Sequence, residues 1–232
     1  MAALLRSGFN TWAQKDTTPT TGHLDFKGYN DTRCFAVLTI NLMSNIHHRV
    51  QYFSLTNYQG AKNTSDLISL YSAQNIRWVF RKNPPKDLLL LYVLRSNNGN
   101  DGLKFGFRWK LSPTKPVVVL LKKMNTFYSI NPMFVQFQEH VPTKYMTTIE
   151  HFYAINLFSK ALNKILYISG FVDQNFVCTS DNSLIFKWVS EHQVGIRMID
   201  KGYLVAEFRS NNYAAEQVGV VYGVEYLLPI KA

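Results

Sequence analysis

Basic side chains are concentrated in one stretch of the sequence. Residues 77–123 contain eleven lysines and arginines but only two acidic residues, whereas the segments on either side are close to neutral. Guanidinium and ammonium groups bind phosphates and carboxylates, so a basic segment between near-neutral flanks indicates a surface that meets an anion. Anion binding is therefore the first chemistry that this sequence suggests.

Two parts of this stretch alternate between basic and apolar residues. Residues 76–81 and 104–111 place aromatic or aliphatic side chains at every second position. Successive side chains of a strand point to opposite faces, so both segments predict strands with a buried aromatic face and an exposed basic face. The predicted nucleic-acid-binding residues are Arg77, Arg81, Lys82, Lys104, Arg108, Lys110, Lys122 and Lys123.

A basic sheet face of this kind suits the backbone of a nucleic acid, because lysine and arginine release condensed counterions when they bind it. Nothing in the spacing indicates base readout, and RNA and DNA stay open as alternatives. Two other interpretations also stay open. The face could only keep the protein in solution, or it could contact an acidic membrane.

The sequence contains no recognised catalytic or cofactor-binding motif. It lacks the glycine-rich dinucleotide and phosphate loops and the Gly-x-Ser-x-Gly motif, and its six histidines show no metal-ligand spacing. Cys34 lies in an apolar run, where a core position is expected rather than a nucleophile. We therefore expect a protein that is not an enzyme and that has no cofactor and no metal.

Composition places the chain among packed, β-rich proteins. It has 232 residues, of which 47% are hydrophobic and 14% aromatic, and aromatic enrichment favours strands. With only Cys34 and Cys178, a reduced compartment is expected, and a single disulfide between them is the alternative. No apolar run resembles a signal peptide or a transmembrane helix, so the chain is not expected to be secreted.

The spacing of the predicted strands favours one antiparallel β-sandwich domain. Short strands with turn signals between them argue for a sandwich or a barrel. The run from Leu88 to Leu94 predicts a strand buried on both faces, and residues 218–228 alternate most regularly. Thr147 and Glu150 have capping-box spacing, which predicts one longer helix near 148–164. We expect a flexible segment at 1–24 and a single domain at 25–232.

Two segments resemble the single jelly-roll coat proteins of small viruses. Residues 70–84 look like the short helix, basic strand and proline of such shells, and residues 218–229 are similar to their closing strand. Coat proteins often carry an arginine-rich arm, but residues 1–24 contain only Arg6 and Lys15, so the basic face would have to contact the genome.

This resemblance implies a jelly-roll-like sandwich and a capsid protein that assembles with itself and with nucleic acid. Its location would be the virion and the host cytoplasm or nucleus. The alternatives are a non-assembling nucleic-acid-binding viral protein, of the movement or silencing-suppressor type, and a matrix-like protein on acidic membranes.

Overall fold

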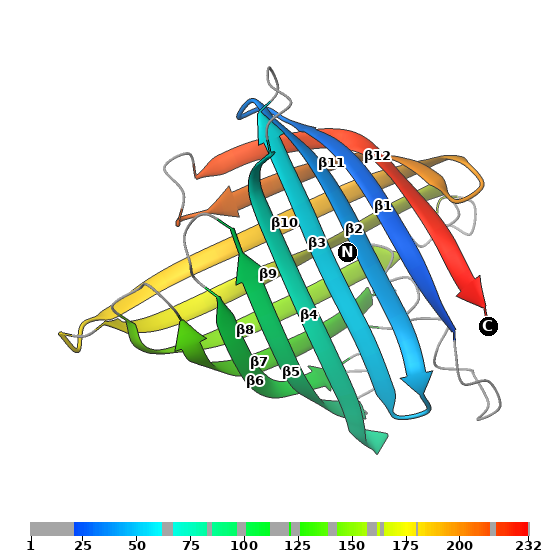
Figure 1. Cartoon of the computed structure of the whole chain (residues 1–232). Coiled ribbons are helices and arrows are strands. Elements are labelled where there is room, and N and C mark those ends of the chain that lie inside the picture. Colours follow the sequence, from blue (N-terminus) through cyan, green and yellow to red (C-terminus); the bar gives the residue numbers. More distant parts are fainter. Residues whose placement is uncertain are drawn as a thin grey trace.

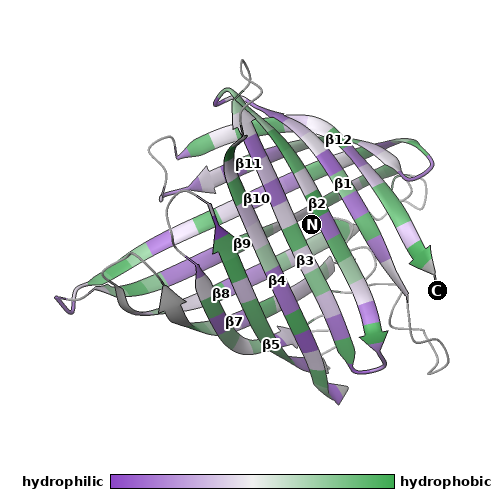
Figure 2. Ribbon diagram, in the orientation of Figure 1, coloured by the Kyte–Doolittle hydropathy of each residue, from purple (hydrophilic) through white to green (hydrophobic). Residues whose placement is uncertain are grey.

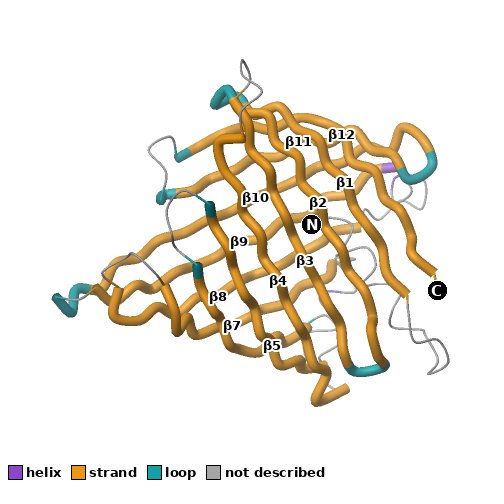
Figure 3. The backbone as a smooth tube through the Cα atoms, in the orientation of Figure 1, coloured by secondary structure: helices purple, strands orange, loops and turns teal. Residues whose placement is uncertain are grey.

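The chain forms twelve antiparallel strands that follow one another around a closed barrel (Figure 1). The computed structural model describes residues 21–61, 67–82, 85–96, 101–111, 121, 126–138, 143–156, 162, 165–179, 181–213 and 217–231. The strands are β1 (Thr21–Asp31), β2 (Phe35–His47), β3 (Val50–Ala61), β4 (Leu67–Lys82), β5 (Pro85–Arg95), β6 (Gly102–Lys110), β7 (Thr126–Gln138), β8 (Thr143–Asn156), β9 (Leu166–Thr179), β10 (Leu184–Ile199), β11 (Gly202–Asn211) and β12 (Val218–Lys231). Strand makes up almost all of the described trace (Figure 3).

The barrel closes where its first and last strands meet. β1 pairs with β12 from Thr21 opposite Lys231 to Asp31 opposite Val221. Closure gives both edges of the sheet a partner, which removes the exposed edges of an open sheet. The prediction of a mainly β chain is confirmed, but the predicted jelly-roll sandwich is wrong, because the twelve strands form one continuous ring.

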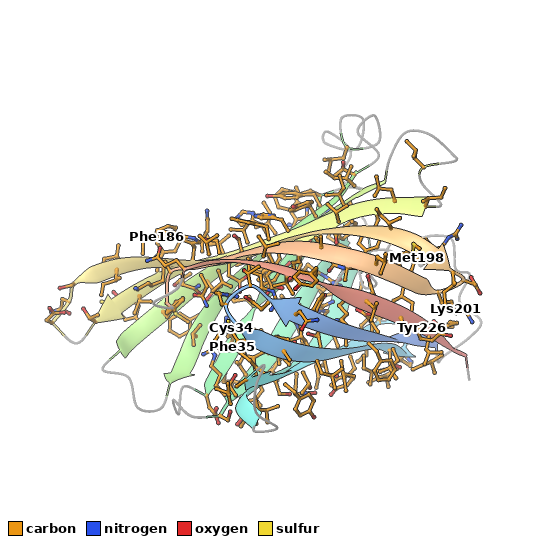
Figure 4. All side chains as sticks on the ribbon, turned by 90° about the horizontal axis from the view of Figure 1, so that it is seen from above. Cys34, Phe35, Phe186, Met198, Lys201 and Tyr226 are labelled. Carbon is orange, nitrogen blue, oxygen red and sulfur yellow. The ribbon has the colours of Figure 1, made fainter. Side chains whose placement is uncertain are left out.

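The barrel is mainly apolar on its outer surface and largely polar inside. On β12, the outward Val220, Tyr222 and Val224 are 45%, 52% and 57% exposed. The inward Val221 and Glu225 of the same strand are 0% and 1% exposed. Hydropathy alternates in this way along most strands (Figure 2), and side chains stand on both sides of the strand wall (Figure 4).

This polarity reverses the predicted orientation of the basic strands. The alternation expected at 76–81 and 104–111 is present in β4 and β6, but Trp78 and Phe107 lie outside while Arg77 and Lys104 are buried inside. Alternation defines two faces of a strand, and it does not specify which one meets the surroundings. The expected exposed basic face over an aromatic core is therefore wrong.

The apolar run Leu88–Leu94 is also explained by the barrel. Leu89, Leu91 and Val93 point inward, whereas Leu90 and Tyr92 are on the outside, each 44% exposed. The inward residues pack in an apolar cluster with Ala73 and Met133, so both faces of β5 need apolar side chains. The prediction that the strand is buried on both faces is wrong.

The helix predicted near 148–164 is replaced by a strand. β8 covers the first part of that range and pairs with β7 and β9. Residues 145–155 are rich in β-branched and aromatic side chains, which fit a pleated surface better than a helix. Thr148 and Ala154 of this strand point inward and are buried. The five residues 157–161 that follow the strand lie outside the described part of the chain.

Two other predictions fall partly outside the described residues. Of the segment 1–24 that was expected to be flexible, residues 21–24 begin β1 and residues 1–20 are not described. The apolar run at 117–121 is described only at its last residue.

Candidate functional site: the charged interior of the barrel

One group of charged residues inside the barrel surrounds a buried lysine. We call it the Lys27 centre, and its members are Asp25, Lys27, Tyr167, Gln193 and Glu225. The Lys27 Nζ lies 3.6 Å from Asp25 Oδ2 and 3.9 Å from Glu225 Oε1, and it donates a hydrogen bond of 3.0 Å to Gln193 Oε1. One cation is thus shared by two carboxylates.

Further hydrogen bonds hold these carboxylates in place. Tyr167 donates to Glu225 Oε2, and Gln193 Nε2 donates to the same oxygen at 3.2 Å. Asn41 Nδ2 donates to Asp25 Oδ2 at 2.9 Å. Because a buried charge is costly unless it is paired and hydrogen-bonded, these contacts explain how the centre tolerates its burial.

A second group has the opposite composition. We call it the Asp87 centre, and it consists of Gln51, Arg77, Asp87, Arg108 and Lys110. Arg108 Nε donates to Asp87 Oδ2 at 2.6 Å, and Lys110 Nζ lies 3.5 Å from the same oxygen. Arg108 Nη2 also donates to Gln51 Oε1 at 3.0 Å.

Arg77 is the third cation of the Asp87 centre. Its guanidinium carbon lies 5.0 Å from the centre of the Phe53 ring, a cation–π arrangement. Its buried Nε has no hydrogen-bond acceptor among the described residues. The Asp87 centre therefore contains three cations and one carboxylate, and one donor in it is unused.

Two neighbouring carboxylates lie on β8 and β9. Glu150 and Asp173 are directly opposite each other in the register, and Asn131 Nδ2 donates to Glu150 Oε2 at 2.6 Å. Lys104 interacts electrostatically with both carboxylates. Asp173 Oδ1 is buried without a hydrogen-bond donor in the described part of the chain.

A further set of contacts joins β1, β10 and β11. Arg209 forms ion pairs with Glu207 and, at 3.8 Å, with Glu191. Tyr29 donates to Glu207 Oε2 at 3.5 Å, and Arg209 lies over the Tyr29 ring. Both carboxylates therefore share one arginine, as Asp25 and Glu225 share Lys27.

The interior charges are separated by sign around the barrel. Strands β4–β6 form a basic wall, and strands β8–β12 with β1 form an acidic wall. Between them, β2, β3 and β7 contain no Asp, Glu, Lys or Arg. The inward charged residues of the basic wall are Arg77, Arg95, Lys104, Arg108, Lys110 and Asp87. Those of the acidic wall are Asp25, Asp31, Glu150, Asp173, Glu191, Glu207, Glu225, Lys27, Lys187, Arg197 and Arg209.

The structure brings half of the predicted binding residues together. Arg77, Lys104, Arg108 and Lys110 all point into the barrel from the basic wall, although the sequence placed them on an exposed face. Arg81 is exposed near the end of β4. Lys82 ends β4 with a side chain that is not described, and Lys122 and Lys123 lie outside the described residues.

The acidic wall was missed entirely at the sequence level. Its residues are scattered over six strands, so no cluster of like charges is visible along the chain. The available signal was a charged residue at an inward position of a regular strand. Glu225 interrupts the alternating run of β12 in this way, and Lys27 lies between Phe26 and Gly28 in β1.

Other chemistry is not evident in the described part of the chain. There, no group of three or more His, Cys, Asp or Glu residues could hold a metal ion. Cys34 is exposed and Cys178 is buried, and neither forms a disulfide. No helix among the described residues is both long and apolar enough to cross a membrane.

Solved structures with the same type of barrel are bacterial porins and channels. The KdgM porin superposes with a TM-score of 0.54 at 9% identity, covering 88% of this chain and 98% of its own. The NanC porin reaches 0.58 at 10% identity, covering 90% and 100%. An outer membrane channel from Pseudomonas putida F1 reaches 0.50 at 6% identity, covering 92% and 96%. No protein-family model and no curated protein sequence matches the chain.

These similarities, together with the closed barrel, overturn the viral interpretation. The fold is the porin-type barrel and not the jelly roll of a coat protein, so the predicted capsid function and the virion and host-cell location are wrong. The predicted assembly of the chain into a shell rested on the coat-protein resemblance and is wrong. The predicted nucleic-acid partner rested on an exposed basic face. That face is replaced by an interior wall.

Proposed function

We propose that this protein is a channel of a bacterial outer membrane that passes small polar solutes through its interior. The observation that carries this proposal is the reversed polarity of the closed barrel. In water, the many large apolar side chains on its outer surface would be exposed to an extent that monomeric proteins normally avoid. In lipid the same surface is favourable, and closure leaves every strand paired, as a membrane requires.

The dimensions and charges of the barrel support this function. The shortest strand, β6, has 9 residues, and a tilted strand of roughly 9–11 residues crosses the hydrocarbon core of a bilayer. An even number of antiparallel strands with apolar residues outside and polar residues inside is typical of outer-membrane barrels. That the chain is not an enzyme and binds no cofactor stays a prediction.

The interior contacts limit the size of a solute. Lys27 on β1 reaches Gln193 on β10, and Arg108 on β6 reaches Gln51 on β3. Each pair joins strands that are three apart in the barrel order. Side chains therefore extend far into the interior, and we expect small solutes rather than polymers to pass.

The membrane location can be tested with the tryptophans. Trp78, Trp109 and Trp188 are at outward positions, and Trp12 lies outside the described residues, so a Trp12→Phe variant reports on the outer surface alone. We expect lipids brominated on their acyl chains to quench its fluorescence strongly, and acrylamide in water to quench it weakly. The opposite ranking would contradict insertion into a bilayer.

The channel activity can be tested in planar bilayers. We expect the purified, folded protein to produce stepwise conductance increases and the heat-unfolded protein to produce none. The folded barrel should also migrate differently from the heated one in a denaturing gel. Insertion without conductance would contradict the channel and leave only a membrane anchor.

A further inference from the structure

The basic and acidic walls lie on opposite sides of the interior. β6, which carries Arg108 and Lys110, and β12, which carries Glu225, are six strands apart in both directions around the ring of twelve. The uncharged strands β2, β3 and β7 separate the two walls. A solute inside the barrel would therefore meet positive charge on one side and negative charge on the other.

Residues of the two walls are close enough to interact. Glu150 interacts electrostatically with Lys104, Arg77 and Arg108. Asp173 interacts with Lys104 and Arg95 from the basic wall, and with Glu191 from its own wall. Glu150 on β8 and Lys104 on β6 are separated only by the uncharged strand β7, so the acidic and basic walls approach each other in this part of the interior.

The ion pairs within each wall do not neutralise the charge on either side of this region. In the Asp87 centre, Arg108 and Lys110 share one carboxylate, and Arg77 keeps a buried Nε donor with no acceptor among the described residues. On the other side, Glu150 and Asp173 have Lys104 as their common cation, and Asp173 Oδ1 has no donor among the described residues. A positive and a negative excess are thus left, each with an unused hydrogen-bonding atom.

We propose that this region binds zwitterionic solutes of the α-amino acid class. The carboxylate of the solute lies toward Arg77 in the Asp87 centre, and its ammonium group lies toward Glu150 and Asp173. An anion alone would meet the acidic wall, and a cation alone would meet the basic wall, so each is disfavoured relative to a molecule that carries both charges. This inference rests on the proposed channel function and specifies its solute.

The test is the swelling of proteoliposomes in solutes that differ mainly in charge. L-Glutamine is the zwitterion, potassium L-glutamate the anion, L-lysine chloride the cation and xylose the neutral control of similar mass. Because oppositely charged walls raise the local concentration of a complementary solute, we expect glutamine to enter on the order of tenfold faster than xylose. Glutamate and lysine should enter more slowly than glutamine.

Two variants separate the contributions of the walls. Arg77→Gln should shift the preference toward lysine and make the reversal potential in a KCl gradient more cation-selective, and Asp173→Asn should do the opposite. Arg49→Gln and Asp200→Asn remove the same charges from exposed hairpin turns and should change neither readout. Heat-modifiable migration shows that each variant folds, and Arg77→Lys should retain the preference for glutamine.

The outcomes distinguish the inference from the proposed function. No swelling above protein-free liposomes would remove the channel, and the inference with it. Swelling in which glutamate is fastest, with Asp173→Asn indistinguishable from the parent, would show a simple anion channel and overturn the inference alone. Equal rates for glutamine and xylose would also overturn it while leaving the channel intact.

Discussion

The Lys27 centre and the Asp87 centre both hold buried charged side chains inside the barrel, but the shared central group is a cation in the first and a carboxylate in the second. In the first, one buried ammonium group serves Asp25 and Glu225, whereas in the second, one buried carboxylate serves Arg108 and Lys110. Neutral side chains complete both: Tyr167 and Gln193 donate to Glu225, and Gln51 accepts from Arg108. The comparison shows that neither centre is electrically neutral, and that the excess charge is negative in the Lys27 centre and positive in the Asp87 centre.

The largest effect is expected at the seam between β1 and β12, because both centres depend on a closed barrel. A Cβ at Gly223 would collide with the carbonyl group of Gly28 across the seam. We expect Gly223→Ala to prevent closure, with loss of heat-modifiable migration and of conductance. The control is Gly28→Ala on the same seam, whose Cβ would make only an ordinary contact of 4.0 Å with Val224. Equal behaviour of the two variants would contradict the register at the seam.

Removing the shared cation should have the next largest effect. Lys27→Met leaves Asp25 and Glu225 buried without their common partner, which we expect to destabilise the barrel by about 3–5 kcal/mol. Urea unfolding followed by tryptophan fluorescence measures the change. Adding Glu225→Gln should recover part of the loss, because it removes one of the two stranded carboxylates. No recovery would mean that Lys27 acts through packing alone.

Removing the shared carboxylate should cost less. Asp87→Asn keeps an oxygen acceptor for Arg108, which also retains its bond to Gln51, so we expect a loss of about 1.5–3 kcal/mol, the range of one hydrogen bond to a charged group. The same urea unfolding applies. A larger loss than for Lys27→Met would reverse the comparison and show that the cations of the basic wall depend on Asp87 more strongly than the carboxylates depend on Lys27.

The smallest expected effect lies in the turn between β9 and β10, outside both centres. Hydrogen bonds from Thr179 and Ser183 lower the pKa of Asp181 to about 2. Because the folded pKa is depressed, its contribution to stability is complete above the ordinary value of 3.8 and is lost as the pH falls toward about 2. Limited pepsin digestion over this pH range should show increasing cleavage at residues 180–183. In Asp181→Asn the cleavage should not depend on this titration, and a parallel increase in the variant would contradict the assignment.

Local sequence patterns predicted several of the strands but not the side of each strand that faces the interior. The two-residue period of 76–81, 104–111 and 218–228 was read correctly, because alternation is a property of the strand itself. The prediction near 148–164 failed because Thr147 and Glu150 match a capping box by spacing alone, while cross-strand pairing with β7 and β9 decides the conformation of β8. Such pairing cannot be seen in a single stretch of sequence.

The candidate site was likewise only partly predictable from the sequence. The basic wall was visible as a run of charge, because β4, β5 and β6 are consecutive in the chain and next to one another in the barrel. The acidic wall is spread from Asp25 to Glu225, and only the closure of β1 on β12 gathers it into one side of the interior. The sequence by itself therefore determined the strand-rich composition, the alternation and the location of the basic residues. The tertiary structure alone decided that those residues point inward and face carboxylates, because orientation and opposition depend on how the ring of twelve strands closes and not on any local preference.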